Sequence, residues 1–171
     1  NDYVGKTPVA ITFCPLSGAA IVYDRRVEMD GQERVLKFGT SGMLRFTSTV
    51  LWDLETESWW QQLTGEAMVG DLAGTKLKVV PYKILSYEAF LEANPYGMVM
   101  VNNIDDEVPY GTNPYYHYDK TSNVKPFLLT GLLNARLPAM QRVVSIESMD
   151  EQFLYPLNMI RPNGVLNDTP N

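Results

Sequence analysis

The feature that most constrains the fold of this chain is its division into short runs of β-branched and aromatic residues separated by glycine and proline. Val9–Cys14 is such a run, and Pro15 and Gly18 close it. Runs of about four to eight residues bounded by turn-forming residues are typical of β-strands, because helices need longer segments with a period of about 3.6. The first two-thirds of the chain therefore predicts a succession of short strands.

The expected strands follow one another closely along the sequence. Phe46, Val50 and Trp52 fall on alternate positions, which indicates a strand with one buried face. Asp30-Gly31 and residues 39–42 are predicted to form turns. The expected strands are Val9–Cys14, Ala20–Val27, Arg34–Phe38, Arg45–Leu54, 58–70 with a break near Gly65, Lys76–Tyr82, 97–102, Phe127–Leu133 and Gln141–Glu147.

A short helix is predicted at about residues 86–94, since Ser86 suits its N-cap and Pro95 ends it. Residues 102–126 form a polar and aromatic segment longer than ordinary loops, so we expect either a functional loop or a brace packed by its own tyrosines. Residues 1–171 are thus expected to form a single, mainly β domain: an antiparallel β-barrel or sandwich-like fold with one short helix and long irregular loops.

Composition limits the classes of function open to this chain. The 171 residues carry a formal net charge of −6, which argues against a nucleic-acid partner because phosphate binding needs a basic surface. A single cysteine excludes an internal disulfide framework and a zinc site of several thiolates. No stretch approaches the roughly 18–20 apolar residues of a membrane-spanning helix. The chain starts without methionine, and Asn1-Asp2 and Asn167-Asp168 echo each other, so we expect a segment cut at both ends from a longer chain.

Cys14 is the residue that most invites a chemical role. In the stretch TFCPLSG it begins a pattern in which Ser17 stands in place of the second thiol of a redox motif. Without that thiol a dithiol–disulfide cycle within the chain is impossible, and the flanking residues do not predict a helix that would lower the pKa of Cys14. We interpret Cys14 as a small buried residue at a strand end closed by a Pro-Gly turn, and keep it as a candidate metal ligand.

His117 is the only histidine, so a hydrolase of the Ser-His-Asp or Cys-His type would have to use it. It lies among Tyr115, Tyr116 and Tyr118, and packing against these tyrosines is the favoured interpretation. One histidine cannot supply a copper site made of one cysteine and two histidines. We predict no catalytic residue and no cofactor, and His117 joins Cys14 as a candidate metal ligand.

Tryptophans and tyrosines are the expected contacts with a partner protein, because these residue types are enriched at interfaces. Trp59 and Trp60 are neighbours in an expected strand and should point to opposite faces of it. One of them is therefore expected in the core, and the other is a candidate partner contact. The predicted interaction residues are Trp59, Trp60, Tyr110, Tyr115, Tyr116, His117 and Tyr118.

A set of motifs runs in one order along nearly the whole chain: TFCPLSGAAIVYDR, FGTSGMLRFTSTVLWDLETESWWQQLTGEAMVGDLAGTKL, SYEAF, PYGTNPYYHYD and RVVSIE. Together they resemble the uncharacterised bacterial family known as domain of unknown function 3179. The resemblance implies an exported protein in the periplasm or at the cell surface, or one anchored to the membrane through an N-terminal segment that is missing here. It brings no established activity.

Two departures from the family pattern concern candidate ligands. Members usually carry a second cysteine where this chain has Ser17, which weakens any thiol or metal role carried over to Cys14. Members also tend to carry a Trp-His-Glu segment just before the Asn-Asp pair, and that segment is absent ahead of Asn1.

The leading hypothesis is a non-catalytic extracytoplasmic binding or accessory subunit that docks on a larger membrane-associated assembly, for which an electron-transport complex is one candidate. The alternative is a redox or metal-handling protein in which Cys14 binds copper or haem. A hydrolase that pairs Cys14 with His117 is ranked last. The expected partners are protein subunits of a membrane complex, and neither nucleic acid nor a membrane span is expected.

Overall fold

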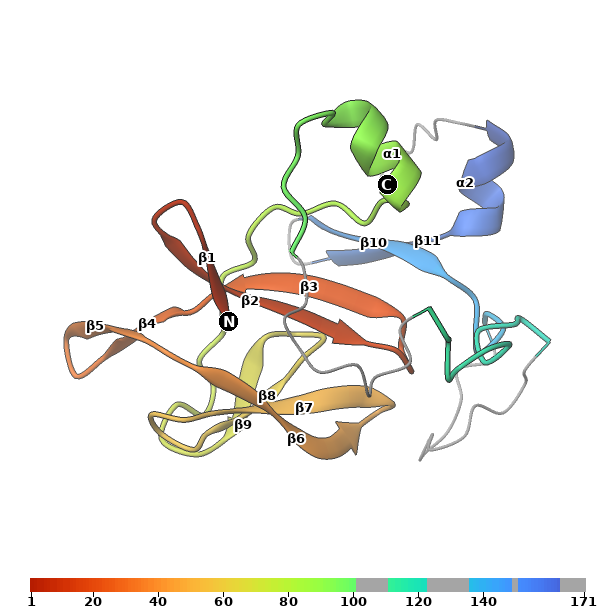
Figure 1. The fold of residues 1–171 in the computed structure, drawn as a ribbon. Helices are drawn as coiled ribbons and strands as arrows, with labels where there is room; N and C mark the ends of the chain where they lie inside the picture. Colours follow the sequence, from red (N-terminus) through yellow and green to blue (C-terminus); the bar gives the residue numbers. More distant parts are fainter. Residues whose placement is uncertain (101–110, 123–135, 149–150, 164–171) are drawn as a thin grey trace. The chain divides into compact units, whose positions relative to one another are not determined.

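The computed structural model describes residues 1–100, 111–122, 136–148 and 151–163 (Figure 1). Contacts divide the chain into two compact units, Asn1–Tyr116 and His117–Asn171. The prediction of a single domain cut from a longer chain stays a prediction.

The first sheet contains, in antiparallel order, β1 (Asp2–Val4), β2 (Thr7–Cys14) and β3 (Ala19–Asp24). Cys14 pairs with Ala19 at the end of β2. The turn between them contains Pro15 and Gly18, and Gly18 has a positive φ of 64° that suits a residue without a side chain. The strand predicted at Val9–Cys14 and the turn that closes it are confirmed.

A hairpin of β4 (Arg26–Met29) and β5 (Gln32–Val35) follows the first sheet. Asp30 and Gly31 join the two strands with φ values of 52° and 72°. Two successive positive φ values are typical of a type I′ turn, whose twist fits a pair of antiparallel strands. The turn predicted at these two residues is confirmed.

The second sheet contains β6 (Phe38–Arg45), β7 (Ser48–Asp53), β8 (Trp59–Gln61) and β9 (Glu66–Val69), antiparallel throughout. The break predicted near Gly65 lies between β8 and β9. A Cβ atom at Gly65 would lie 2.5 Å from the ring of Tyr23, so the chain can pass this ring only where it has no side chain.

The inner faces of the two sheets share one core within the first unit. Phe38 and Trp60 meet edge to face in it, with ring centroids 5.5 Å apart. The prediction of a mainly β, antiparallel fold is confirmed, and the strands in the described part of the chain form no closed barrel, so the arrangement is compatible with a sandwich. The buried core residues are Ala10, Tyr23, Val27, Leu36, Phe38, Leu51, Trp60, Ala67, Leu72 and Leu77.

Arg25 divides the strand predicted at Ala20–Val27. Its backbone N–H donates to the Pro8 carbonyl at 3.0 Å, and its carbonyl accepts from the Leu36 N–H at 2.9 Å, so the chain leaves β3 at this point. The guanidinium is buried and donates to the Leu36 carbonyl at 2.7 Å. The single strand predicted here is wrong, because the break at Arg25 depends on its hydrogen bonds to Pro8 and Leu36, which are distant in the sequence.

The bounds predicted around β6 are also wrong. Arg34–Phe38 is not one strand, since β5 ends at Val35 and β6 begins at Phe38. Residues 39–42, predicted as a turn, belong to β6, which carries a register shift between Thr40 and Leu44. A β-bulge accommodates glycine and small polar residues within a strand. Residues 39–42 can therefore belong to β6 although their composition is typical of a turn.

The segment Lys76–Tyr82, predicted as a strand, makes isolated β-bridges and no continuous strand. The Asp24 N–H donates to the Lys78 carbonyl at 2.8 Å, and the Val80 N–H donates to the Val22 carbonyl at 2.9 Å. The segment therefore runs beside β3 and covers part of its edge.

The helix α1 (Tyr87–Ala93) confirms the predicted helix and its start. Ser86 is the N-cap, and its Oγ accepts a hydrogen bond from the Ala89 N–H at 3.1 Å. None of the residues of α1 is buried. Of the strand predicted at 97–102, residues 97–100 form no strand, and the last two lie outside the described residues.

The described part of the second unit contains β10 (Val143–Ser148), β11 (Glu151–Pro156) and α2 (Leu157–Asn163). The two strands pair antiparallel. β10 confirms the strand predicted at Gln141–Glu147, whereas the sequence does not predict β11 or α2. The strand predicted at Phe127–Leu133 lies outside the described residues.

Candidate functional site

Cys14 is fully buried at the end of β2. Its Sγ donates a weak hydrogen bond to the Thr47 carbonyl oxygen, 3.7 Å away. Burial raises the pKa of the thiol, but hydrogen bonding with Ser17 and Thr49 outweighs this effect and leaves the pKa below its ordinary value. The structure confirms Cys14 as a buried residue at a strand end, whereas reactive cysteines are usually partly exposed.

His117 begins the second unit, while Cys14 belongs to the first. His117 is exposed and has a positive φ of 66°. A metal site or hydrolase that uses both residues stays a prediction. Within the described ranges, no three His, Cys, Asp or Glu side chains gather closely enough to hold a metal ion.

The tyrosine-rich segment offers fewer surface contacts than the sequence predicts. Tyr116 and His117 are exposed and Tyr115 is half-buried. Tyr118 is buried, so a partner cannot reach most of its side chain in this structure. Tyr110 lies outside the described residues. Tyr116 and His117 are the accessible candidates of this group.

Trp59 and Trp60 occupy opposite environments on β8, as expected for neighbouring strand positions. Trp60 is fully buried, and its Nε1 donates to Asp53 Oδ2 at 2.8 Å. Trp59 is 39% exposed. Trp60 is therefore a core residue, out of reach of a partner, and Trp59 stays a candidate for surface contact.

A buried carboxyl group holds the turn from β7 to β8. Besides Trp60, Asp53 binds the backbone N–H and the hydroxyl of Thr56, which donate to Oδ1 at 2.7 and 2.9 Å. The Oγ1 of Thr56 in turn lies 2.7 Å from the Oγ of Ser58. Glu57 has a positive φ of 56°, and its N–H donates to the Asp53 carbonyl at 3.0 Å. These bonds fix the position of Glu57.

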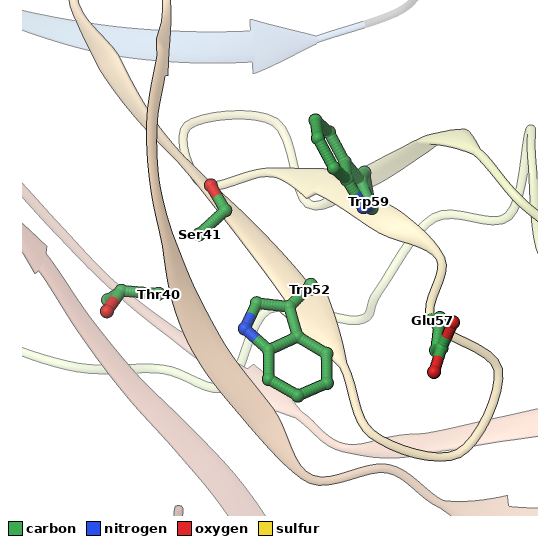
Figure 2. Close-up of a pocket in the computed structure, with 5 residues that line it drawn as sticks. All are labelled: Thr40, Ser41, Trp52, Glu57 and Trp59. Atoms are coloured by element: carbon green, nitrogen blue, oxygen red, sulfur yellow. The ribbon is translucent and has the colours of Figure 1, made fainter.

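A hollow of about 300 Å³ opens beside this turn (Figure 2). Trp59 lines it, whereas Trp60, the next residue of β8, points to the opposite face of the second sheet. Trp52 on β7 lies directly opposite Trp59 on β8, and Figure 2 shows the two indoles splayed apart. The Oγ of Ser41 donates to the Val50 carbonyl at 2.6 Å, so this hydroxyl is already engaged. The hollow is lined by Thr40, Ser41, Trp52, Glu57 and Trp59.

Gly39 determines how the indole of Trp52 lies. The two residues face each other across β6 and β7. A Cβ atom at Gly39 would lie 2.9 Å from Nε1 and 3.2 Å from Cε2 of Trp52. The indole therefore rests against the backbone of β6, where any side chain would displace it.

A second exposed surface, here named the outer β2 face, consists of Ile11, Phe13, Ala20 and Val22. Ile11 pairs with Val22, and Phe13 pairs with Ala20, so the four side chains share one face of the first sheet. Ile11 and Phe13 are 63% and 66% exposed, and Ala20 and Val22 are half-buried. Tyr23, on the opposite face, belongs to the core.

The sequence did not predict the outer β2 face or the position of Trp52 in the lining of the hollow. Nearly every position of Val9–Cys14 is apolar, so period-two alternation could not tell which side of the strand is covered. The buried face predicted from Phe46, Val50 and Trp52 is wrong, because Phe46 lies between β6 and β7 and is 66% exposed, and the core residue of β7 is Leu51. The position of Trp52 opposite Trp59 depends on strand register, which no local signal in the sequence reveals.

None of the helices in the described ranges is long and apolar enough to cross a lipid bilayer. The family model described as "Protein of unknown function (DUF3179)" matches residues 1–171, which is the whole chain. A search of curated proteins and a search of solved structures each found no match. The motifs singled out in the sequence and the match over the full length agree: the chain belongs to the DUF3179 family.

Proposed function

We propose that this protein is a non-catalytic binding module or accessory subunit that works outside the cytoplasm and docks on a larger membrane-associated assembly. The observation that carries the proposal is the outer β2 face, where two large apolar side chains of one strand stand exposed. The resemblance to exported bacterial proteins supports the location. An electron-transport complex is one candidate for the assembly.

The outer β2 face is a continuous apolar patch. Single exposed apolar side chains are common in soluble proteins, but a contiguous group of them typically marks an interaction site. Burying a large apolar side chain contributes roughly 1.5–3 kcal/mol. A partner that covers Ile11 and Phe13, together with the half-exposed Ala20 and Val22, would therefore gain a substantial driving force for binding.

The strands that present this patch are held in place from behind. Thr12, which lies between Ile11 and Phe13 and points to the opposite face, donates to the Ile21 carbonyl at 2.8 Å. Its hydroxyl also accepts from Gln62 Nε2 at 3.0 Å, which ties β2 to the segment after β8. A surface that is already ordered loses little conformational entropy on binding, so more of the burial energy remains as affinity.

A protein surface is the occupant that fits the outer β2 face. Small ligands usually bind in clefts that enclose most of their surface. The outer side of a sheet covers a ligand on one side only, which suits the surface of another protein. Interfaces between proteins have apolar centres of this kind, rich in aromatic residues. Phe13 is the aromatic side chain that would occupy the centre of such a contact.

A matched pair of variants tests the docking. Ile11→Lys and Val69→Lys both replace a β-branched strand residue that is 63% exposed, but only the first lies on the outer β2 face. Each variant replaces the wild-type protein in its host, and solubilised membranes are separated on native gels. We expect the wild type and Val69→Lys to migrate with a larger complex, and Ile11→Lys to migrate without it.

Two results would contradict the proposal. The wild-type protein could migrate alone, or Ile11→Lys could stay in the complex as firmly as Val69→Lys. Deleting the protein provides an independent check, since an accessory subunit should alter the composition or stability of the complex on which it docks. Unchanged membrane complexes after deletion would exclude the accessory role.

A further inference from the structure

We propose that the hollow beside the β7–β8 turn binds one ring of a neutral saccharide, with Trp52 and Trp59 as stacking surfaces and Glu57 as a hydrogen-bond acceptor. The hollow lies on the second sheet, whereas the outer β2 face lies on the first. The inference therefore goes beyond protein docking and does not depend on it.

The two indoles form a preformed apolar platform. Side chains directly opposite each other on antiparallel strands have Cβ atoms about 5 Å apart, so Trp52 and Trp59 begin close together. Their rings then diverge, which leaves the hollow open between them (Figure 2). Gly39 lets the indole of Trp52 rest against β6, so this ring is supported from behind. Ring faces held in this way pack well against the C–H groups of another ring.

Glu57 is held at the edge of the same hollow by a strained turn. Non-glycine residues with positive φ persist only where surrounding bonds fix them, and such residues are often found at binding sites. Here the buried carboxyl of Asp53 and the hydroxyl of Thr56 hold the turn. Two separate features, the close approach at Gly39 and the strain at Glu57, thus place side chains around one hollow.

The polar groups around the hollow match a ligand that carries hydroxyl groups. The Nε1 of Trp59 is a donor and the Glu57 carboxylate is an acceptor, and neither has a hydrogen-bond partner in the described part of the chain. The Nε1 of Trp52 instead lies against the backbone of β6 at Gly39. A hydroxyl both donates and accepts, so one sugar ring can serve both Trp59 and Glu57. The volume of about 300 Å³ lies at the small end of ligand sites and suits one ring rather than an enclosed chain.

Other classes of ligand fit the hollow less well. A wholly apolar molecule would cover the carboxylate and the indole N–H group of Trp59 without giving them partners, which is unfavourable. An anion would be repelled by Glu57 and by the net charge of −6. A tetraalkylammonium ion would satisfy the rings and the carboxylate but offers no acceptor to the Trp59 N–H donor.

The test measures binding by the full chain, with tryptophan fluorescence and titration calorimetry as independent readouts. The probes are maltotetraose, cellotetraose and tetra-N-acetylchitotetraose, with tetramethylammonium as the competing cation. We expect at least one saccharide to bind and tetramethylammonium not to bind. Trp59→Ala should weaken saccharide binding roughly tenfold, as expected for truncation of a central aromatic contact. Glu57→Gln should weaken it less, because the amide keeps one acceptor oxygen.

Two further variants separate this site from folding and from docking. Gly39→Ala keeps both indoles but displaces Trp52, so it should weaken binding while the melting temperature confirms a folded protein. Tyr96→Ala removes an almost fully exposed aromatic residue away from the hollow and should bind normally. Ile11→Lys should also bind normally, because it changes only the outer β2 face.

The proposal is overturned if none of the three saccharides binds, or if tetramethylammonium binds in a way that depends on Trp59 and Glu57 while the saccharides do not. It is also overturned if Trp59→Ala and Glu57→Gln, both folded, bind the saccharide as tightly as Tyr96→Ala does. Loss of complex formation in Ile11→Lys with intact saccharide binding would show that the two surfaces act separately.

Discussion

Acidic residues are usually exposed and large apolar residues are usually buried. The turn after β7 and the outer β2 face are opposite exceptions to this rule. At the turn an acidic side chain, Asp53, is fully buried, whereas on β2 the apolar Ile11 and Phe13 are about two-thirds exposed. Asp53 is surrounded by hydrogen-bond donors from its own neighbourhood, so its burial serves the fold. The exposed apolar pair has no such local explanation, which is why we propose it as the docking surface. Burial of a polar group thus marks a structural position, and exposure of an apolar pair marks the position where a functional role is proposed.

Asp53→Ala tests the structural role of the buried carboxyl and should have the largest effect on stability. The change leaves the fully buried Trp60 indole N–H without an acceptor and removes the carboxyl that holds the N–H and hydroxyl of the half-buried Thr56. Each buried donor left unpaired costs about 1–3 kcal/mol, so we expect the free energy of unfolding to fall by roughly 3 kcal/mol or more. Urea denaturation measures this loss. Asp71→Ala, at an exposed carboxyl, should change stability by less than about 0.5 kcal/mol, and equal effects would contradict the structural role of Asp53.

Cys14 tests whether a second buried polar group, its thiol, also has a structural role and no chemical one. Because Cys14 is fully buried, we expect a thiol reagent to modify it rapidly in urea and very slowly in the native protein. Cys14→Ala should reduce the free energy of unfolding by about 1 kcal/mol through lost packing. Metal analysis and an optical spectrum of natively purified protein complete the test. Bound copper or haem that disappears in Cys14→Ala would instead support the redox or metal-handling alternative.

Asp24 is a buried acidic residue that forms an ion pair with Arg26. Its Oδ1 accepts hydrogen bonds from the backbone N–H of Arg26 at 3.0 Å and from Nε at 2.9 Å. The hydrogen bond from the Arg26 side chain holds the pKa of Asp24 below its ordinary value of 3.8, although burial opposes this shift. The folded pKa is thus lower than the unfolded one, so the stabilisation is present above pH 3.8 and is lost as pH falls through the folded pKa.

Asp24→Asn should therefore lower the free energy of unfolding at neutral pH and leave it less dependent on pH in the acid range below 3.8. Denaturation curves recorded at several pH values measure both quantities. Wild-type and variant curves that run parallel through the acid range would show that the pairing with Arg26 does not contribute as the structure indicates. This effect should be smaller than that of Asp53→Ala, because the Arg26 side chain is partly exposed.

The smallest expected effect on stability belongs to Phe13→Ser, on the outer β2 face. Phe13 is 66% exposed, so its replacement should change the free energy of unfolding by no more than about 0.5 kcal/mol. The same variant should weaken docking as Ile11→Lys does. A large loss of stability would mean that Phe13 supports the fold, and the distinction between the turn after β7 and the outer β2 face would then fail.

Local signals in the sequence predicted those parts of the fold that depend on neighbouring residues. Ser86 caps α1 because its hydroxyl reaches an N–H three residues ahead, and Asp30-Gly31 forms a turn because both residues tolerate positive φ. The break between β3 and β4 at Arg25 was not predicted, because the backbone hydrogen bonds of Arg25 go to Pro8 and Leu36, which are distant in the sequence. The candidate site divides in the same way: Trp59 was found from strand alternation, whereas its neighbour across the sheet, Trp52, was not.

The sequence by itself determined the family, the mainly β class, the cap of α1 and the opposite orientations of Trp59 and Trp60. Each of these follows from short patterns, which act through neighbouring backbone bonds and the alternation of side chains along a strand. Only the tertiary structure decided that Trp60 is buried, that Trp52 stands opposite Trp59, and that Ile11 and Phe13 are exposed. Burial and register depend on which strands meet in space, and segments far apart in the sequence establish those contacts.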